Sequence, residues 1–91
     1  MKVVYKYRIG NGEEFTLLAP KGAEFLSVQL QGQDVQLWAR VDAEAPKVLY
    51  KFGIAGTGNY LPPFAASAPF IGTFQLAGGA LVFHLFGGTE A

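Results

Sequence analysis

The sequence predicts an all-β fold, a single small domain of about seven antiparallel strands arranged as a sandwich or a small barrel. Three observations predict it. Apolar residues recur at every second position along most of the chain, which is the period of a strand with one buried face. The alternating runs are short, and clusters of glycine, proline, asparagine and aspartate separate them. Almost no segment shows the helical period of about 3.6 residues.

The first two alternating runs predict a β-hairpin. The first spans residues 2–9 and would bury Val3, Tyr5, Tyr7 and Ile9 on one face. Gly10-Asn11-Gly12 accepts positive φ, as a tight hairpin turn demands. A return strand through Phe15 and Leu17 ends at the turn sequence Ala19-Pro20-Lys21-Gly22. We therefore expect these two strands to pair with each other.

The middle of the chain predicts a second hairpin and a fifth strand. Apolar residues alternate with polar ones over residues 26–31 and again over residues 35–42, on either side of Gly32-Gln33-Asp34. Residues 42–46 form a polar turn that ends in a proline. Alternation returns over residues 47–54, which we expect to be the fifth strand.

The last third of the chain contains a long irregular connection and two more strands. Glycines and prolines over residues 56–69 exclude a strand and leave room for one helical turn at most. A connection of this length in a small domain is typically functional or packed on itself. Residues 70–76 and 80–86 resume as strands around Ala77-Gly78-Gly79. The final strand is apolar on both faces, which predicts a central position, and residues 87–91 resemble a frayed tail.

Composition narrows the class of protein. The 91 residues contain no cysteine, which excludes disulfides and thiolate metal sites. Seven basic residues balance seven acidic ones, whereas a general nucleic-acid binder carries a basic excess. No run approaches the roughly 18–20 apolar residues of a membrane helix, and the N-terminus lacks the apolar core of a signal peptide. We therefore expect a soluble, cytoplasmic protein without membrane contact, cofactor or metal.

His84, the only histidine, is one candidate for chemistry. A catalytic histidine needs a nucleophile and an orienting group within hydrogen-bond reach, and the sequence specifies neither. A metal site is disfavoured because no second histidine, cysteine or nearby pair of carboxylates accompanies it. We expect a structural, hydrogen-bonded His84, with a ligand contact as the alternative.

The glycine-rich segment Gly56-Thr57-Gly58-Asn59 is a second candidate. A phosphate cradle normally needs a following helix N-terminus or a nest of backbone amides. Pro62-Pro63 prevents any substantial helix there, and the lysine of a P-loop is absent. A simple turn is the first interpretation, and an amide-lined binding loop is the alternative.

Basic residues project from the predicted strands, whereas acidic residues cluster at or beside turns. A basic sheet surface with aromatic side chains suits an acidic protein, a nucleotide or single-stranded nucleic acid. Lysines also protect exposed sheets from aggregation, so a simple solvated surface stays open. Trp38 either covers a small core beneath the long loop or anchors a partner. The candidate binding residues are Trp38, Arg40, Lys47, Lys51, Gly56, Thr57, Gly58, Asn59, Tyr60 and His84.

Six motifs follow one another along nearly the whole chain: Tyr5-Lys6-Tyr7, Pro20-Lys21-Gly22-Ala23, Leu37-Trp38-Ala39-Arg40-Val41-Asp42, Gly56-Thr57-Gly58, Ile71-Gly72-Thr73-Phe74-Gln75 and Val82-Phe83-His84-Leu85-Phe86. In this order they resemble a family of small uncharacterised bacteriophage and prophage proteins, classed as a domain of unknown function. Members often carry a histidine after Gly-Thr-Gly, where this chain has Asn59, so any paired-histidine site would be incomplete here. The resemblance implies a phage or prophage setting and brings no catalytic residues.

These observations favour a non-enzymatic phage or prophage accessory protein. We expect it to bind a host or phage protein through a surface that combines Trp38, Arg40, the strand lysines and residues 56–69. High apolar content also favours a homo-oligomer. One alternative is an oligomeric protein that sequesters an anionic nucleotide signal and so counters host defence. Another is a minor virion component. No nucleophile, base and orienting group can be assembled from the sequence, so we do not expect an enzyme.

Overall fold

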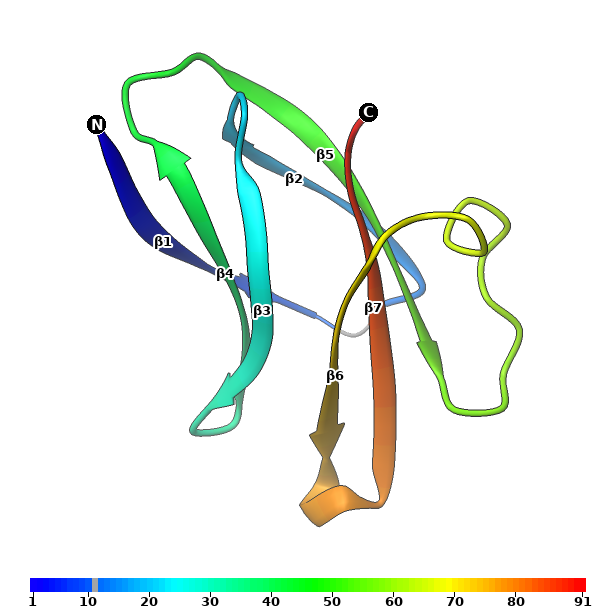
Figure 1. Ribbon diagram of the computed structural model, residues 1–91. Helices are drawn as coiled ribbons and strands as arrows, with labels where there is room; N and C mark the ends of the chain where they lie inside the picture. The colour runs from blue at the N-terminus through cyan, green and yellow to red at the C-terminus, as the bar shows by residue number, and fades with distance from the viewer. Residues whose placement is uncertain (11) are drawn as a thin grey trace.

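The computed structural model describes residues 1–10 and 12–91 and shows two antiparallel sheets packed face to face (Figure 1). One sheet has the strand order β1-β4-β3 and the other β2-β5-β7-β6. The strands formed by the described residues are β1 (Lys2–Ile9), β2 (Glu14–Pro20), β3 (Glu24–Gln31), β4 (Asp34–Asp42), β5 (Lys47–Gly56), β6 (Phe70–Leu76) and β7 (Leu81–Glu90), with one short 3-10 turn, η1 (Ala77–Gly79). The predicted all-β domain is confirmed, and its architecture is a sandwich.

The predicted hairpin between the first two strands is wrong. β1 pairs with β4 in the three-stranded sheet, and β2 pairs with β5 in the other. Asn11, at the centre of the predicted turn, lies outside the described residues. Period-two alternation shows which face of a strand is buried but does not name its partner. The predicted second hairpin is confirmed, since β3 pairs with β4. The last two predicted strands are also present, and β6 pairs with β7.

The C-terminal residues form part of the sheet, so the predicted tail over 87–91 is also wrong. β7 continues to Glu90 beside β5, and the Ala91 amide donates to the Leu49 carbonyl oxygen at 2.8 Å. Gly87 has a φ of 125°, and a Cβ there would lie 2.4 Å from the Lys51 carbonyl oxygen. The glycine therefore accommodates a shift in the β5–β7 register and does not end the strand.

The hydrophobic core lies between the two sheets. Its largest fully buried side chains include Leu37 of β4 from one sheet and Phe52 of β5 from the other. Phe25 of β3 reaches across, and its ring meets those of Tyr50 and Phe52 edge to face, with centroids 5.1 and 4.9 Å apart. Burial of these aromatic surfaces supplies much of the force that joins the sheets. β7 lies between β5 and β6, as its apolar sequence predicts.

The edges of the two sheets meet where β3 passes β6. A Cβ on Gly72 of β6 would lie only 2.8 Å from Cγ1 of Val28 on β3. The missing side chain at Gly72 lets the two edges approach, so this side of the sandwich is closed by packing. The opposite side of the three-stranded sheet ends at β1, which pairs with no other strand among the residues that the structure describes.

Candidate functional site

Trp38 lies half-buried at the middle of β4, on the outer face of the three-stranded sheet. The strand register places Lys6 of β1 on one side of it and Ser27 of β3 on the other. The Lys6 ammonium nitrogen is 5.8 Å from the centroid of the indole ring, within range of a cation–π contact. Val4 lies on the same face and is 59% exposed. We call this surface the Trp38 face: Val4, Lys6, Glu24, Ser27, Trp38 and Arg40.

Charges on the Trp38 face are largely paired. The Arg40 guanidinium donates from Nε and Nη2 to the two carboxylate oxygens of Glu24, at 3.2 and 2.8 Å. This hydrogen-bonded pair lowers the pKa of Glu24 and raises that of Arg40. Nearby, Arg8 lies 3.3 Å from Asp34. Acidic residues at the strand ends thus neutralise both arginines, and the surface is less basic than strand alternation alone indicates.

His84 lies on the outer face of the other sheet, held between two threonines. Its Nε2 is 2.7 Å from the Thr57 hydroxyl, and its Nδ1 is 2.8 Å from the Thr73 hydroxyl. The register places His84 opposite Thr73 of β6, which is why the two side chains meet. Sequence analysis missed Thr73, because only the pairing of β6 with β7 brings it to the histidine.

The line of Thr57, His84 and Thr73 has the order of a nucleophile, a base and an orienting group. It differs in chemistry from a catalytic triad, because a threonine hydroxyl carries no negative charge to stabilise an imidazolium. Both ring nitrogens are engaged by protein hydroxyls. The arrangement joins the end of β5 to β6 through β7, as a structural histidine would.

The Gly56-Thr57-Gly58-Asn59 segment forms a turn stabilised by a hydrogen bond from the Asn59 amide to the Gly56 carbonyl oxygen, 3.0 Å long. Beside it lies a shallow cavity of about 280 Å³, which residues 80–83 also line. No charged side chain lines this cavity. Lys51 precedes Thr57 by six residues, roughly 20 Å along an extended strand, so the turn lacks the cation that a phosphate ligand favours.

Residues 56–69 lie against the four-stranded sheet and are well separated from β4, the strand that carries Trp38 (Figure 1). A Cβ on Gly53 of β5 would lie 2.8 Å from Cβ of Ala65 and 3.4 Å from the ring of Phe64. The Lys51 ammonium nitrogen lies 4.8 Å from the Phe64 ring centroid. Trp38 and this loop therefore occupy different faces, and the structure does not assemble the combined binding surface that the sequence suggests.

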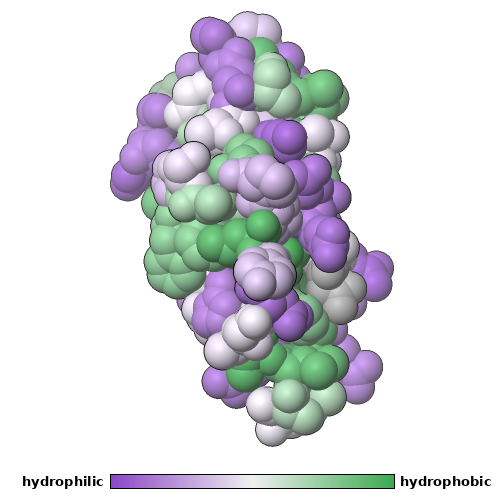
Figure 2. Space-filling view, turned by 90° about the vertical axis from the view of Figure 1, so that its right-hand side faces the viewer, coloured by the Kyte–Doolittle hydropathy of each residue, from purple (hydrophilic) through white to green (hydrophobic). Residues whose placement is uncertain are grey.

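Tyr60 belongs to the 56–69 loop, whereas Lys47 lies at the other end of β5 from that loop. Tyr60 is fully exposed, and Lys47 is exposed at the start of β5. Figure 2 views the molecule from the loop side and shows hydrophobic side chains in separate patches among hydrophilic ones. Of the ten candidates, only Trp38 and Arg40 share a face of the three-stranded sheet.

Comparison with known sequences places the chain in a family. The sequence profile of a domain of unknown function, DUF7352, matches residues 1–91. The chain belongs to this family. No curated protein and no solved structure shows a significant match.

The structure describes residues 1–10 and 12–91 of this family member. Within them, no group of three or more histidine, aspartate or glutamate side chains lies close enough to hold a metal ion. No helix in the same part of the chain has the length and apolar character of a membrane span. A cavity of about 610 Å³ opens between the β3–β4 turn and η1 and is lined by uncharged residues that include Leu30, Gln33 and Gln75. Sequence analysis did not identify it, because it exists only where the two hairpin ends come together.

Proposed function

We propose that this chain is a non-enzymatic accessory protein that acts by binding a partner protein through the Trp38 face. The observation that carries the proposal is the half-exposed indole at the centre of an open sheet face, with Lys6 over its ring. Tryptophan and arginine are the residue types that most often dominate binding energy at protein interfaces. The resemblance to bacteriophage and prophage proteins supports a phage or prophage setting.

The surroundings of Trp38 fit an interface better than a core. Val4 is exposed beside it, and the Arg40 and Glu24 side chains at its edge are 50% and 52% exposed. A partner that covers this face would bury the indole and Val4 while the charged pairs stay at the rim, where exposed ion pairs contribute little affinity. Occlusion of a partner's site is therefore the mechanism that we propose.

Site-specific photo-crosslinking in the producing cell tests this function. A benzoylphenylalanine at Val4 should capture a discrete partner, whereas the same residue at Thr16, on the outer face of the other sheet, should not. Trp38→Ala should weaken partner affinity about 30-fold or more, and Tyr60→Ala should leave it unchanged. Circular dichroism of each variant reports whether the fold survives.

Other results would redirect the proposal. Equal capture from Val4 and Thr16, or capture that Trp38→Ala leaves intact in a folded protein, would remove the Trp38 face from consideration. A loss of partner affinity in Tyr60→Ala would indicate that the binding site lies in residues 56–69. Retention of a small anionic molecule in native mass spectrometry would favour the sequestering alternative instead.

A further inference from the structure

β1 is a long strand at the end of its sheet. It pairs with β4 over eight consecutive residues without a register shift. Among the described residues, the backbone hydrogen bonds outside the strand pairings include none from residues 2–9. The other edge of β1 therefore presents a continuous row of backbone donors and acceptors, which is a template for a further strand.

The remaining sheet edges are less suited to strand addition. β3 and β6 each carry a register shift, between Phe25 and Ser27 and between Phe70 and Gly72, and their edges pack against each other at Val28. β2 is one residue shorter than β1 and ends in Pro20, which has no amide hydrogen to donate. β1 is the longer of the two regular edges of the described structure.

The side chains of β1 define the chemistry of a guest strand. Lys2, Lys6 and Arg8 all point to the outer face, in register with Asp42, Trp38 and Gln36. Val3 and Tyr5 point to the other face and are each 41% exposed, because no strand of the second sheet covers them. A strand laid beside β1 would thus meet cations on one face and uncovered apolar side chains on the other.

A second copy of this chain fits the edge poorly. Consider two copies of β1 paired antiparallel, with their outer faces on the same side. If the symmetry axis passes through Val4, Lys2 of one copy lies opposite Lys6 of the other. Centring on Tyr5 places Lys2 opposite Arg8, and centring on Lys6 places that lysine opposite itself. Like charges directly across a strand pair are destabilising, so the edge selects against itself and for a partner of opposite charge.

We propose that β1 binds an extended segment of a partner protein in which acidic and apolar residues alternate, added as a fourth strand to the β1-β4-β3 sheet. Acidic side chains would lie beside Lys2, Lys6 and Arg8, and apolar ones beside Val3 and Tyr5. The exposed pair of Arg8 with Asp34 is weak enough to exchange for the partner's carboxylate. This mode rests on the proposed function, because the acidic side chains would occupy the same outer surface as Trp38.

Peptide binding tests the strand addition directly. The probe is an eight-residue peptide that alternates glutamate with valine, compared with a scrambled peptide of equal composition and a lysine–valine counterpart. We expect the alternating acidic peptide to bind at least about tenfold more tightly than either control, and to protect the amides of β1 from hydrogen exchange while those of β2 are unaffected. Equal affinity for the three peptides would overturn the proposal. Binding of the acidic peptide without protection of the β1 amides from hydrogen exchange would overturn it as well.

Charge reversal provides a variant that leaves the backbone intact. Lys2→Glu combined with Lys6→Glu should abolish binding of the acidic peptide and confer binding of the lysine peptide. If the acidic peptide still binds this folded variant, the inference is wrong. If no peptide binds while crosslinking from Val4 still depends on Trp38, strand addition fails and the proposed function stands. Self-association of the native protein through β1 in sedimentation would likewise contradict the proposal.

Discussion

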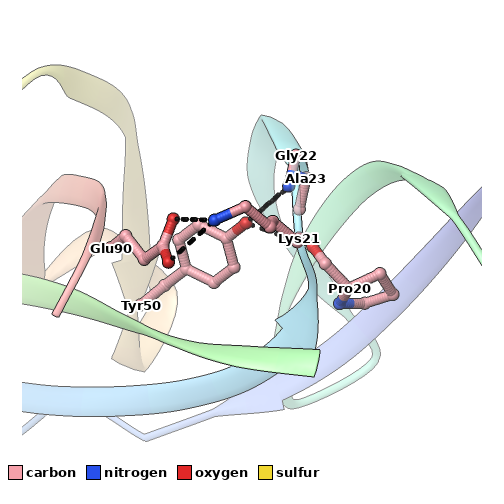
Figure 3. Close-up of polar contacts among 6 residues, drawn as sticks. All are labelled: Pro20, Lys21, Gly22, Ala23, Tyr50 and Glu90. Atoms are coloured by element: carbon pink, nitrogen blue, oxygen red, sulfur yellow. Dashed lines mark hydrogen bonds and ion pairs between the residues drawn. The ribbon is translucent and has the colours of Figure 1, made fainter. Parts of the chain in front are cut away.

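The hydroxyl of Tyr50 donates a hydrogen bond to the backbone carbonyl oxygen of Pro20 across 3.1 Å, although the two residues are 30 positions apart (Figure 3). The Tyr50 hydroxyl oxygen also accepts hydrogen bonds from the Gly22 and Ala23 amides at 3.0 and 3.2 Å. One buried side chain of β5 thereby fixes the turn through which the chain leaves the four-stranded sheet and enters the other.

Tyr50→Phe should therefore destabilise the domain. The substitution keeps the ring in the core but removes the hydroxyl, so the Gly22 amide loses its partner in this turn. We expect the free energy of unfolding to fall by about 1–2 kcal/mol, measured by urea denaturation. Tyr60→Phe, at a fully exposed side chain, is the matched control and should change nothing measurable. Equal stability of the native and Tyr50→Phe proteins would show that the turn is held by other contacts.

Gly87→Ala should be among the most damaging single substitutions in the chain. Its φ of 125° is unfavourable for alanine, and the new Cβ would collide with backbone atoms of Lys51 and Phe52. We expect a loss of at least about 2 kcal/mol in unfolding free energy. Gly10→Ala has no atom within 4 Å of its new Cβ and serves as the control. A Gly87→Ala protein that melts like the native one would mean that β7 ends before this residue.

Stability at acidic pH should depend on Glu24. Its pKa is lowered in the folded protein, chiefly by the hydrogen bond from Arg40, so its contribution is present above the unfolded value of 4.5. That contribution disappears as pH falls through the lowered folded pKa. The melting temperatures of the native protein and Glu24→Gln should therefore converge between pH ~5 and ~3. If the difference between the two melting temperatures stayed constant across this pH range, the ion pair of Glu24 with Arg40 would not be its cause.

Thr57→Val should loosen the glycine-rich turn without unfolding the domain. The substitution removes the hydroxyl bound to Nε2 of His84 and leaves the shape of the side chain nearly unchanged. We expect the local opening free energy to fall by about 1 kcal/mol, observed as faster hydrogen exchange at the Asn59 amide, which donates to Gly56. Thr16→Val, on an exposed part of β2, is the control. Unchanged exchange at Asn59 would mean that the turn does not need the histidine.

Most strand positions, the hairpin of β3 with β4 and the inward faces of most strands could be predicted from local sequence. The face of β1 that carries Val3 and Tyr5 is an exception, since each of these side chains is 41% exposed. Alternation at residues 35–42 correctly assigns Leu37 to the core and Trp38 to the outer face, because successive side chains of a strand point in opposite directions. Glycine residues predicted the ends of strands less reliably. Gly87 and Gly88 resemble the end of a strand in sequence, yet both lie within β7 at a register shift. A Cβ would meet backbone atoms of Lys51 and Phe52 at Gly87 and the ring of Phe25 at Gly88.

The candidate site was predictable only in parts. Trp38 and His84 stand out in the sequence because each is the sole residue of its type. Thr73, the second partner of His84, becomes visible only when β6 is known to pair with β7. The separation of Trp38 from residues 56–69 depends on which sheet each element joins.

The sequence by itself determined that the chain is all-β, where most of its strand residues lie and which face of most strands turns towards the other sheet. Those properties follow from side-chain polarity and backbone geometry over a few neighbouring residues. Tertiary structure alone decided that β1 pairs with β4 and not with β2, and that β1 is left at the sheet edge with Lys2 and Lys6 on its outer face. The pairing of strands depends on the burial of apolar side chains that are distant in sequence, such as Leu37 and Phe52. Local alternation does not report this, because a strand has the same alternation whichever strand it pairs with.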